Sequence, residues 1–381
     1  MVQSSQSTTQ RKPHIQMAVI NDLVTDQRVH RSCMTLTGAG YEVTLIGRKL
    51  PKSLPVNRPY ETIRMRLLFR KSIFFYAEYN IRLFFKLMFS PADLFYANDT
   101  DTLLACFLAA KLRRKPVFFD AHELFPEVPE LFHRPLVKRF WEFLEKMLIP
   151  RVDGAVTVCQ SIAGLYRSHY KVTMQVVRNL PYYSETNSIA NTSNQQPTIL
   201  YQGAVNKGRG LLAMVDAMEY LEGYRFLIVG DGDILEPLKR YVATKDWRDR
   251  IHFQGRVALQ QLQGFTSQAT LGYVVMNNIG LNYYYSLPNR IGDFIHAHVP
   301  ILASDFPEIR NIVNHYQIGQ LVEDKIDSKE LASYVRQTIQ KWQEIPENER
   351  HKHFDTVAKE LCWQNEREVL LSAVKNAFIK C

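Results

Sequence analysis

Cysteine is scarce in this chain, and the few cysteines are scattered. The sequence of 381 residues contains no CxxC pair and no Cys/His cluster. That distribution argues against a disulfide framework and against a structural zinc site, and it favours the reducing cytosol. The five cysteines are Cys33, Cys106, Cys159, Cys362 and Cys381.

Long apolar runs are absent as well. No stretch of about 18 uninterrupted apolar residues occurs. The opening segment MVQSSQSTTQRKPH is polar and lacks the apolar core of a signal peptide. We therefore expect neither a membrane-spanning helix nor a secretory leader, and we predict a cytoplasmic protein. Peripheral contact with the inner face of the cytoplasmic membrane stays open.

Acidic residues are outnumbered by basic ones. Lys and Arg total 47 against 38 Asp and Glu, so the net charge is +9 and the isoelectric point is near 9.2. Such a balance suits nucleic acid, anionic lipid or phosphorylated substrates. No known nucleic-acid reader motif and no continuous basic stripe are present, so we expect no nucleic-acid partner.

A GxGxxG fingerprint is also missing after the first strand pattern, HIQMAVI at 14–20. A nicotinamide enzyme built on a doubly wound sheet carries that fingerprint there, because its glycines let the backbone approach the pyrophosphate. A dehydrogenase therefore loses its main support.

What the sequence does have is an alternation of short β-type runs with longer helical patterns. An apolar content of 46% with 22% charge is typical of globular proteins, and the length favours two domains. The alternation predicts an α/β protein with two Rossmann-like, doubly wound domains that face a central cleft. We predict an N-terminal domain over 1–185, a polar linker over 186–197, a C-terminal domain over 198–358, and a final helix over 359–381 as a candidate to pack back on the N-terminal domain.

Polar clusters end three strand patterns of the first half. Asn21-Asp22 ends the first, Asn98-Asp99-Thr100-Asp101 ends a later one, and Asp120-Ala121-His122-Glu123 ends the next. The carboxyl ends of parallel strands share one edge of a sheet, where doubly wound folds bind ligands. A histidine among carboxylates can orient a sugar or move a proton. A buried histidine satisfied by its neighbours is the other interpretation of His122.

Two glycine clusters follow strands of the second half. Gly203 precedes Asn206-Lys207-Gly208-Arg209-Gly210, and Gly230 ends the strand FLIV. Glycines let backbone amides approach an anion, and Lys207 or Arg209 would add positive charge. Ordinary strand exits with solvated cations remain the alternative for both clusters.

The stretch SLPNRIGDFIHAHVPILASDFPE, at 286–308, predicts an amphipathic helix from Asn289. Helical spacing places Asn289, Asp293 and His296 on one polar side. The amides at its start, with Arg290, could hold a diphosphate, and Asp293 could accept hydrogen bonds from a ribose diol. A merely solvated face is the alternative.

These pieces, in their order along nearly the whole chain, resemble the retaining glycosyltransferases of family four, group 1. The matching segments are DQRVHRSCMTLTGAGYEVTLIGR, YANDTDTL, FDAHELFPEVPEL, VVRNLP, YQGAVNKGRGLLAMVDAM, FLIVGDGDILEPLKRYV, FQGRV, the 286–308 stretch and LCWQNEREVLL. The resemblance implies a GT-B fold and transfer of a sugar from a nucleotide-diphosphate donor to a saccharide or lipid-linked acceptor. It also implies a role in cell-surface polysaccharide or glycolipid assembly and no metal or other cofactor.

The resemblance also implies roles for single residues. His122 corresponds to a histidine that faces the donor sugar, Arg209 to a cation beside a Lys-Gly pair, and Asp293 to a ribose-binding acid seven residues before Pro300. We expect these three to be catalytic. The expected substrate-binding residues are Asp99, Glu123, Gly203, Lys207, Gly230, Arg256, Val257, Ser286, Asn289 and Arg290.

The sequence departs from the family pattern at two positions. Tyr285 stands where the family has a glutamate that holds the donor sugar, and Ala204 stands where an arginine often follows the glycine. Asn289, or Ser286 through its backbone, could take over the sugar contact. A sugar-nucleotide epimerase of the same fold and a non-catalytic nucleotide-sugar-binding protein therefore remain as alternatives.

Two segments combine cations with aromatic residues. They span 64–89, where Arg82 and Lys86 lie one helical turn apart, and 134–151. Helices of this composition lie on anionic membrane surfaces, or belong to a core from which their basic residues reach water. Both interpretations are open, and the first predicts peripheral membrane contact beside a lipid-linked acceptor.

Overall fold

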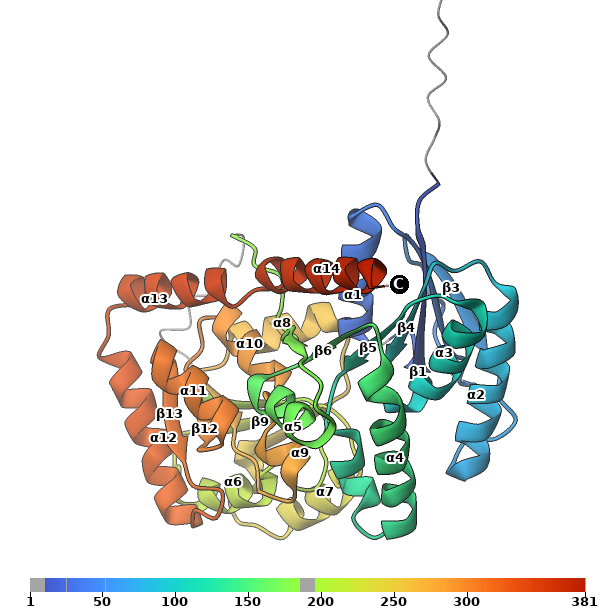
Figure 1. The fold of residues 1–381 in the computed structure, drawn as a ribbon. Helices are drawn as coiled ribbons and strands as arrows, with labels where there is room; N and C mark the ends of the chain where they lie inside the picture. Colours follow the sequence, from blue (N-terminus) through green and yellow to red (C-terminus); the bar gives the residue numbers. More distant parts are fainter. Residues whose placement is uncertain (1–10, 25, 52, 186–195, 381) are drawn as a thin grey trace, which may run out of the picture.

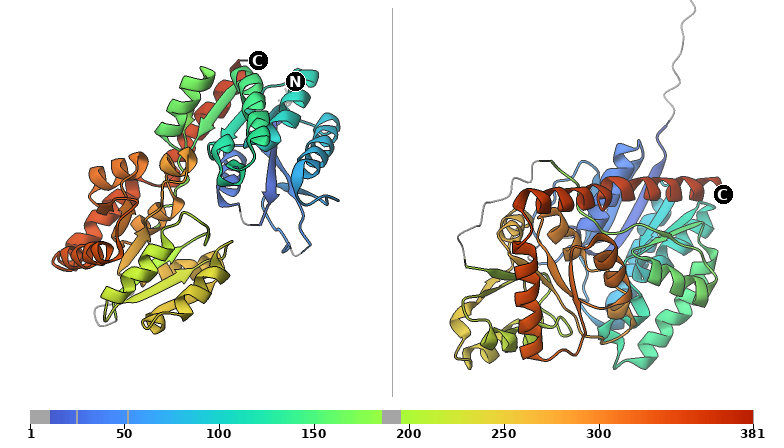
Figure 2. Two further views of the ribbon diagram at one scale, coloured as in Figure 1. Left: turned by 90° about the horizontal axis from the view of Figure 1, so that it is seen from below. Right: turned by 90° about the vertical axis from the view of Figure 1, so that its left-hand side faces the viewer.

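The computed structural model describes residues 11–24, 26–51, 53–185 and 196–380. Two parallel sheets divide the chain, and Figure 2 shows them in separate lobes. This arrangement confirms the predicted pair of Rossmann-like, doubly wound sheets. Most of the predicted linker, residues 186–195, lies outside the described residues, as do Cys381 and most of the polar N-terminal segment.

The first sheet has seven strands in the order β3-β2-β1-β4-β5-β6-β7. Its strands are β1 (His14–Asp22), β2 (Glu42–Arg48), β3 (Glu61–Met65), β4 (Leu94–Asn98), β5 (Val117–Ala121), β6 (Gly154–Thr157) and β7 (Gln175–Val176). The connecting helices are α1 (Gln27–Gly38), α2 (Ser72–Phe89), α3 (Thr100–Arg113), α4 (Pro135–Leu148) and α5 (Gln160–Tyr170).

The second sheet has six strands in the order β10-β9-β8-β11-β12-β13. They are β8 (Thr198–Gln202), β9 (Arg225–Val229), β10 (Ile251–Gly255), β11 (Leu271–Val274), β12 (Ile301–Ser304) and β13 (Gly319–Val322). The helices are α6 (Leu211–Ala217), α7 (Leu235–Ala243), α8 (Leu259–Ser267), α9 (Leu281–Tyr284), α10 (Asn289–His296), α11 (Pro307–Tyr316), α12 (Ser328–Gln343), α13 (Glu347–Glu360) and α14 (Trp363–Ile379).

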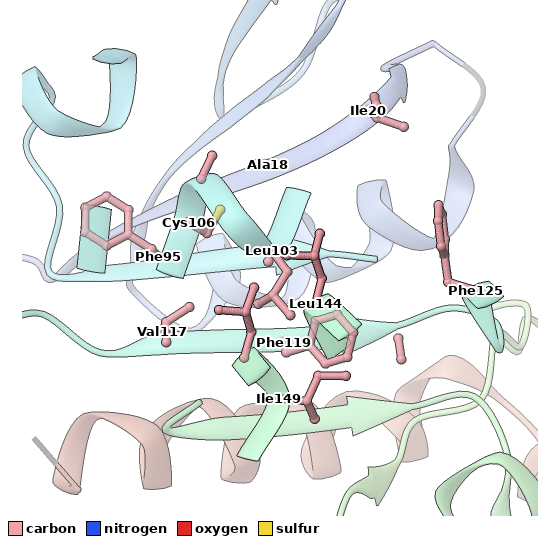
Figure 3. Close-up of a cluster of buried hydrophobic side chains, with 14 of the residues drawn as sticks. Ala18, Ile20, Phe95, Leu103, Cys106, Val117, Phe119, Phe125, Leu144 and Ile149 are labelled. Carbon is pink, nitrogen blue, oxygen red and sulfur yellow. The ribbon is translucent and has the colours of Figure 1, made fainter. Parts of the chain in front are cut away.

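Helices cover both faces of the sheets, and this explains why the central strands are mostly apolar, with polar residues such as Asn98 and Asp120 near their carboxyl ends. Every residue of β4, β5, β11 and β12 is buried, as expected for parallel strands packed on two sides. Figure 3 shows one such core, in which Phe119 of the first sheet lies near Leu103 of α3 and Leu144 of α4, and Phe95 lies near Cys106 of α3.

The last helix, α14, crosses from the C-terminal domain to the outer face of the first sheet (Figure 1). It packs on β6 and α1 through Leu370, Val374 and Ala377, which belong to one core with strands β1, β2 and β5. Trp363 at its start is fully buried, and its indole N–H donates to the Thr35 hydroxyl at 2.9 Å. The C-terminal helix therefore packs on the N-terminal domain.

None of the helices within the described residues is long and apolar enough to cross a membrane.

The packing of α14 predicts a large stability loss on substitution of Trp363. Trp363→Ala removes a fully buried indole and its hydrogen bond, and should lower the free energy of unfolding by about 3–5 kcal/mol. Urea unfolding followed by circular dichroism measures it. Lys375→Ala, at an exposed position of the same helix, should change stability by less than about 0.5 kcal/mol. Equal effects of the two substitutions would contradict the packing.

Candidate functional site

A cavity of about 580 Å³ lies between the two domains, at the carboxyl ends of their strands. This is the edge at which doubly wound sheets bind ligands. Its N-terminal wall comprises Asn21, Asp26, Gln27, Arg28, His122, Glu123, Val158, Ile162 and Asn179. Its C-terminal wall comprises Gln202, Gly203, Ala204, Arg209, Leu262, Asn282, Tyr283, Ser286, Leu287, Pro288, Asn289, Arg290 and Asp293.

A buried ion pair organises the N-terminal wall. The Arg28 guanidinium donates to Asp120 Oδ1 at 2.6 Å and to the Val177 carbonyl at 2.7 Å, and both charged side chains are almost completely buried. The Tyr96 hydroxyl donates to the other Asp120 oxygen at 2.8 Å. Burial alone would raise the pKa of Asp120, but the Arg28 and His122 charges outweigh burial and hold this pKa below its usual range. Asp120 is therefore a permanent anion beneath the site.

His122 lies between two carboxylates. Its Nδ1 is 3.2 Å from Asp99 Oδ2, its Nε2 is 3.5 Å from Asp120 Oδ2, and its backbone N–H donates to Asp99 Oδ1 at 2.7 Å. Burial would lower the pKa of His122, but Asp99 and Asp120 outweigh it and raise the pKa to about 9. The ring is therefore cationic at neutral pH. It can donate a hydrogen bond or stabilise negative charge, but it is not poised to act as a base.

Two arginines dominate the C-terminal wall. Arg290, on α10, is buried and stacks on the Tyr201 ring at 4.8 Å from the centroid. Arg209, in the loop before α6, lies over the Tyr283 ring at 4.5 Å and donates to Met276 Sδ at 3.1 Å. Among the described residues, neither guanidinium forms an ion pair with a carboxylate, whereas Arg28, which is buried as deeply as Arg290, pairs with Asp120. Burial, with the nearby Arg209 charge, lowers the pKa of Arg290.

Asp293 faces the same cavity one turn into α10. Gln202 donates to its Oδ2 at 2.9 Å, and the Thr266 hydroxyl in turn donates to Gln202 Oε1 at 2.7 Å, so the amide orientation is fixed. Burial raises the pKa of Asp293 to about 6, although the Gln202 hydrogen bond and the charges of Arg31 and Arg290 oppose this. The remaining oxygen can accept a hydrogen bond from a ligand hydroxyl.

Gly203 and Gly230 bring two strand ends into direct contact beneath the cavity. The Gly203 N–H donates to the Val229 carbonyl at 3.0 Å, and a Cβ on Gly230 would lie 1.8 Å from the Gly203 carbonyl oxygen. Gly230 also has a φ of +152°, which side chains disfavour. Gly203 lines the cavity and Gly230 does not, so the second glycine supports the loop that carries the first.

Asn282, on α9, crosses the cleft. Its side-chain oxygen accepts from the Leu124 N–H at 3.0 Å, and its amide donates to Glu123 Oε2 at 3.1 Å. Tyr285, one turn later, packs against the core of the N-terminal domain, and its carbonyl accepts from Cys159 at 3.2 Å. The position of the family's sugar-binding glutamate is thus occupied by a residue that joins the domains.

The cavity includes many of the residues singled out from the sequence. His122, Glu123, Gly203 and Arg209 line it, as do Ser286, Asn289, Arg290 and Asp293. Asp99 lies behind His122 as its hydrogen-bond partner.

Other singled-out residues lie away from the cavity lining. They are Lys207, Gly230, Arg256 and Val257. Lys207 and Arg256 are exposed, and Val257 packs against the C-terminal core. His296 was grouped with Asn289 and Asp293 by helical spacing, but it is buried and its Nε2 lies 2.8 Å from the Leu361 carbonyl. The far end of α10 therefore contacts the chain that leads into α14 instead of the cleft.

Several lining residues were not assigned from the sequence. Arg28 and Asp26 lie in the segment DQRVHR, Gln202 directly precedes Gly203, and Asn282 lies in GLNYYY. The first two belong to a segment of the resemblance and could have been singled out there. Gln202 and Asn282 carry no local signal, because their roles depend on partners far away in the chain.

No group of three or more histidine, cysteine, aspartate or glutamate side chains with the geometry to hold a metal ion occurs in the part of the chain that the structure describes.

Comparisons with known proteins agree on a family. Residues 26–180 match the model described as Glycosyltransferase Family 4, and residues 196–341 match the model described as Glycosyl transferases group 1. No curated protein sequence matches the chain.

Solved structures with the same fold cover almost the whole chain. Sucrose-phosphate synthase (tll1590) from Thermosynechococcus elongatus has a TM-score of 0.76 at 17% identity, over 97% of this chain and 100% of that one. Anabaena Alr3699/HepE in complex with UDP-glucose has a TM-score of 0.71 at 13% identity, over 95% and 99%. WaaG, a glycosyltransferase involved in lipopolysaccharide biosynthesis, has a TM-score of 0.65 at 14% identity, over 96% and 99%. At these identities the likeness establishes the fold, which is GT-B.

The ion pairs of His122 predict a pH dependence of stability. Its folded pKa of about 9 lies above the ordinary value of 6.5, so its stabilisation is complete below pH 6.5 and is lost as the pH rises through 9. Between pH 6 and pH 9.5 the wild type should lose up to about 3 kcal/mol more than His122→Asn. Urea unfolding at both values measures the difference. Parallel pH profiles for the two proteins would contradict a protonated His122.

Proposed function

The chain belongs to the group 1 glycosyltransferases of family four, and from that membership we propose that it transfers a sugar from a nucleotide-diphosphate donor with retention of configuration. The acceptor is a saccharide or a lipid-linked saccharide in the assembly of a cell-surface polysaccharide or glycolipid. Family membership favours glycosyl transfer over the epimerase and the binding-only protein that the sequence left open.

The observation that carries this proposal is the pair of arginines without carboxylate partners. Burying a guanidinium without a counter-charge is costly, so such a group marks a site where an anionic ligand supplies the charge. Arg209 and Arg290 flank one side of the cavity, and arginine matches phosphate oxygens in a bidentate manner. The N–H groups at the start of α10, next to Asn289, add partial positive charge. This wall suits a diphosphate.

The rest of the cavity suits the two ends of the donor. Asp293, held by Gln202, is placed to accept a ribose hydroxyl. The sugar would lie toward the N-terminal wall, which the cationic His122 lines. Glu123 lies on this wall and accepts a hydrogen bond from Asn282 of the opposite wall, and this pair could take the sugar contact of the glutamate whose position Tyr285 occupies. The Alr3699/HepE complex, which contains UDP-glucose in the same fold, supports a donor of this class.

The chemistry follows from where charge develops. The bond between C1 of the sugar and the diphosphate oxygen breaks, and a bond from C1 to the acceptor oxygen forms on the same face. The acceptor proton passes to the leaving phosphate, so no protein carboxylate is required as a base. Arg209 and Arg290 stabilise the negative charge on the leaving group, and the cationic His122 orients the sugar.

Loss of either arginine should weaken nucleotide binding. Arg209→Ala and Arg290→Ala each remove a charge-assisted contact of about 1.5–3 kcal/mol, so each should raise the Kd for the bound nucleoside diphosphate about 10- to 100-fold. Isothermal titration calorimetry with UDP, GDP and ADP in turn identifies which nucleotide base the protein accepts and measures the change in Kd. Arg240→Ala, on the exposed face of α7, is the matched control. If both site variants bind the nucleotide with wild-type affinity, the diphosphate does not bind at Arg209 and Arg290.

Nucleotide affinity should also depend on pH through Asp293. Because its pKa is about 6, the carboxylate is ionised and accepts a ribose hydrogen bond above pH 6, and this acceptor is lost as the pH falls. The Kd should therefore rise between pH 7 and pH 5 in the wild type, and Asp293→Asn should bind weakly with a flatter profile. Titration at several pH values compares the two. If the profile of Asp293→Asn is as steep as that of the wild type, Asp293 does not contact the nucleotide.

A further inference from the structure

We propose that a second cavity, on the N-terminal domain, binds the phosphate or diphosphate of a lipid that carries the acceptor sugar. The proposal rests on the proposed function, because it names the class of acceptor for the same transfer. We call this cavity the basic cavity. It has a volume of about 340 Å³ and is lined by Arg48, Lys49, Leu50, Pro51, Arg66, Leu67, Phe69, Arg70 and Phe75.

The charge of the basic cavity is uncompensated. Arg48, Lys49, Arg66 and Arg70 line it, and no acid is among its described lining residues. None of these four cations forms an ion pair within the described part of the chain, whereas Arg64 and Arg82, close by in sequence, pair with Asp22 and Glu78. Four convergent cations without acids attract a group with more than one negative charge.

A second groove, lined by apolar side chains together with Arg64, Arg66, Arg82 and Lys86, adjoins the basic cavity. It has a volume of about 590 Å³, runs between the edge strand β3 and helix α2, and shares Arg66 with the basic cavity. Its apolar lining includes Ile81, Phe85 and Phe89, all more than half exposed. A charged pocket beside a groove of exposed aromatic and aliphatic side chains edged by arginine and lysine matches an amphiphile that has an anionic head and a long hydrocarbon chain.

Helix α2 is apolar on two sides, which a helix of an isolated globular domain is not. Phe75, Tyr79, Leu83 and Leu87 recur every fourth residue and are buried in the first core. On the outer side Ile73, Phe74, Ile81, Phe85 and Phe89 are exposed. Leu68 and Phe69, just before the helix, are exposed too, and the Glu78 carboxylate accepts from both backbone N–H groups. The apolar surface is therefore held in place.

A lipid explains this combination better than a nucleic acid or a protein partner. Large exposed aliphatic and aromatic side chains beside lysine and arginine are the composition of surfaces that enter the interface of an anionic membrane. The outer side of α4, which covers the same face of the sheet, adds Leu136, Phe140 and Phe143 as further exposed apolar residues. Interleaved apolar groups of this size have no role in phosphate-backbone contacts.

The basic cavity lies next to the cavity between the two domains, which is the proposed donor site and is called the donor cavity below. The two are connected through the end of β1, because Asp22 of β1 is the sheet neighbour of Arg48, which lines the basic cavity. Asn21, at the end of β1, lines the donor cavity. The adjacent Asp22 pairs with Arg64 of β3 and accepts from the Ser53 hydroxyl. Ser53 follows the segment Lys49–Pro51 that lines the basic cavity. A sugar linked to a phosphate in the basic cavity is thus presented at the edge of the sheet where the donor sugar would lie.

The test is sedimentation of the full chain with three kinds of vesicle. They contain phosphatidylcholine alone, phosphatidylcholine with polyprenyl diphosphate, and phosphatidylcholine with enough phosphatidylglycerol to match the charge. The wild type should bind the polyprenyl diphosphate vesicles at least about tenfold more tightly than the phosphatidylglycerol vesicles. Arg66→Glu with Arg70→Glu should lower that binding at least about tenfold, and Ile73→Ser with Phe74→Ser should also weaken it.

Lys375→Glu with Lys380→Glu is the control, because it makes the same charge change at one exposed position of α14 and at the exposed residue that follows this helix, on the opposite face of the sheet. It should bind as the wild type does. Equal binding to both anionic vesicles would overturn the proposal in favour of a general membrane surface. So would wild-type binding by the Arg66/Arg70 variant, or an equal loss in the control.

Nucleoside diphosphate titration of the same variants separates this proposal from the proposed function. The Arg66/Arg70 variant should keep the wild-type nucleotide Kd and circular dichroism spectrum, and Lys49→Glu serves as a milder variant of the basic cavity. If the wild type binds no nucleotide but binds polyprenyl diphosphate, the proposed function fails and the lipid site stands. If nucleotide binds and the lipid selectivity is absent, the lipid site alone fails.

Discussion

The proposed donor site depends on two guanidinium groups that stack on tyrosine rings and form no ion pair with an acid among the described residues. Arg290 lies over Tyr201 and Arg209 over Tyr283. A ring face compensates part of a buried cation's desolvation without neutralising its charge. The two cations are therefore in place without an anion, and the proposed diphosphate would gain the attraction of both in a partly water-excluded space.

On the N-terminal wall, in contrast, the buried charges are paired with opposite charges. Asp120 is paired with Arg28, bonded to Tyr96 and close to His122, so its charge is fully compensated and its position is fixed. His122 is cationic because two carboxylates surround it. Positive charge therefore faces the cavity from both domains, from His122 on one wall and from Arg209 and Arg290 on the other. Asn282 bridges the walls through Glu123 and the backbone of Leu124. One side chain therefore links the two walls of the cavity.

The fold could be predicted from the sequence because its signals are local. Apolar runs of strand length, helical periodicity and polar strand ends such as Asp99 and His122 are each readable within about ten residues, and parallel strand order brings those ends to one edge. The stretch from Ser286 was predictable for the same reason, since Asn289, Arg290 and Asp293 lie within two helical turns.

What could not be predicted depends on residues far apart in the chain. Arg28 and Asp120 are 92 residues apart, Gln202 and Asp293 are 91 apart, and Glu123 and Asn282 are 159 apart. No periodicity encodes such pairs. For His296 the local pattern was misleading. Helical spacing groups it with Asn289 and Asp293, but it does not reveal the Leu361 carbonyl that lies within hydrogen-bond distance of its ring.

The position of a bound nucleoside diphosphate tests the central claim most directly. A crystal structure of the protein in complex with the nucleoside diphosphate that binds most tightly would locate the two phosphates. We expect phosphate oxygens within about 3 Å of the guanidinium groups of both Arg209 and Arg290, as hydrogen bonding requires. A diphosphate bound elsewhere, with both arginines still stacked and free of phosphate contacts, would contradict it.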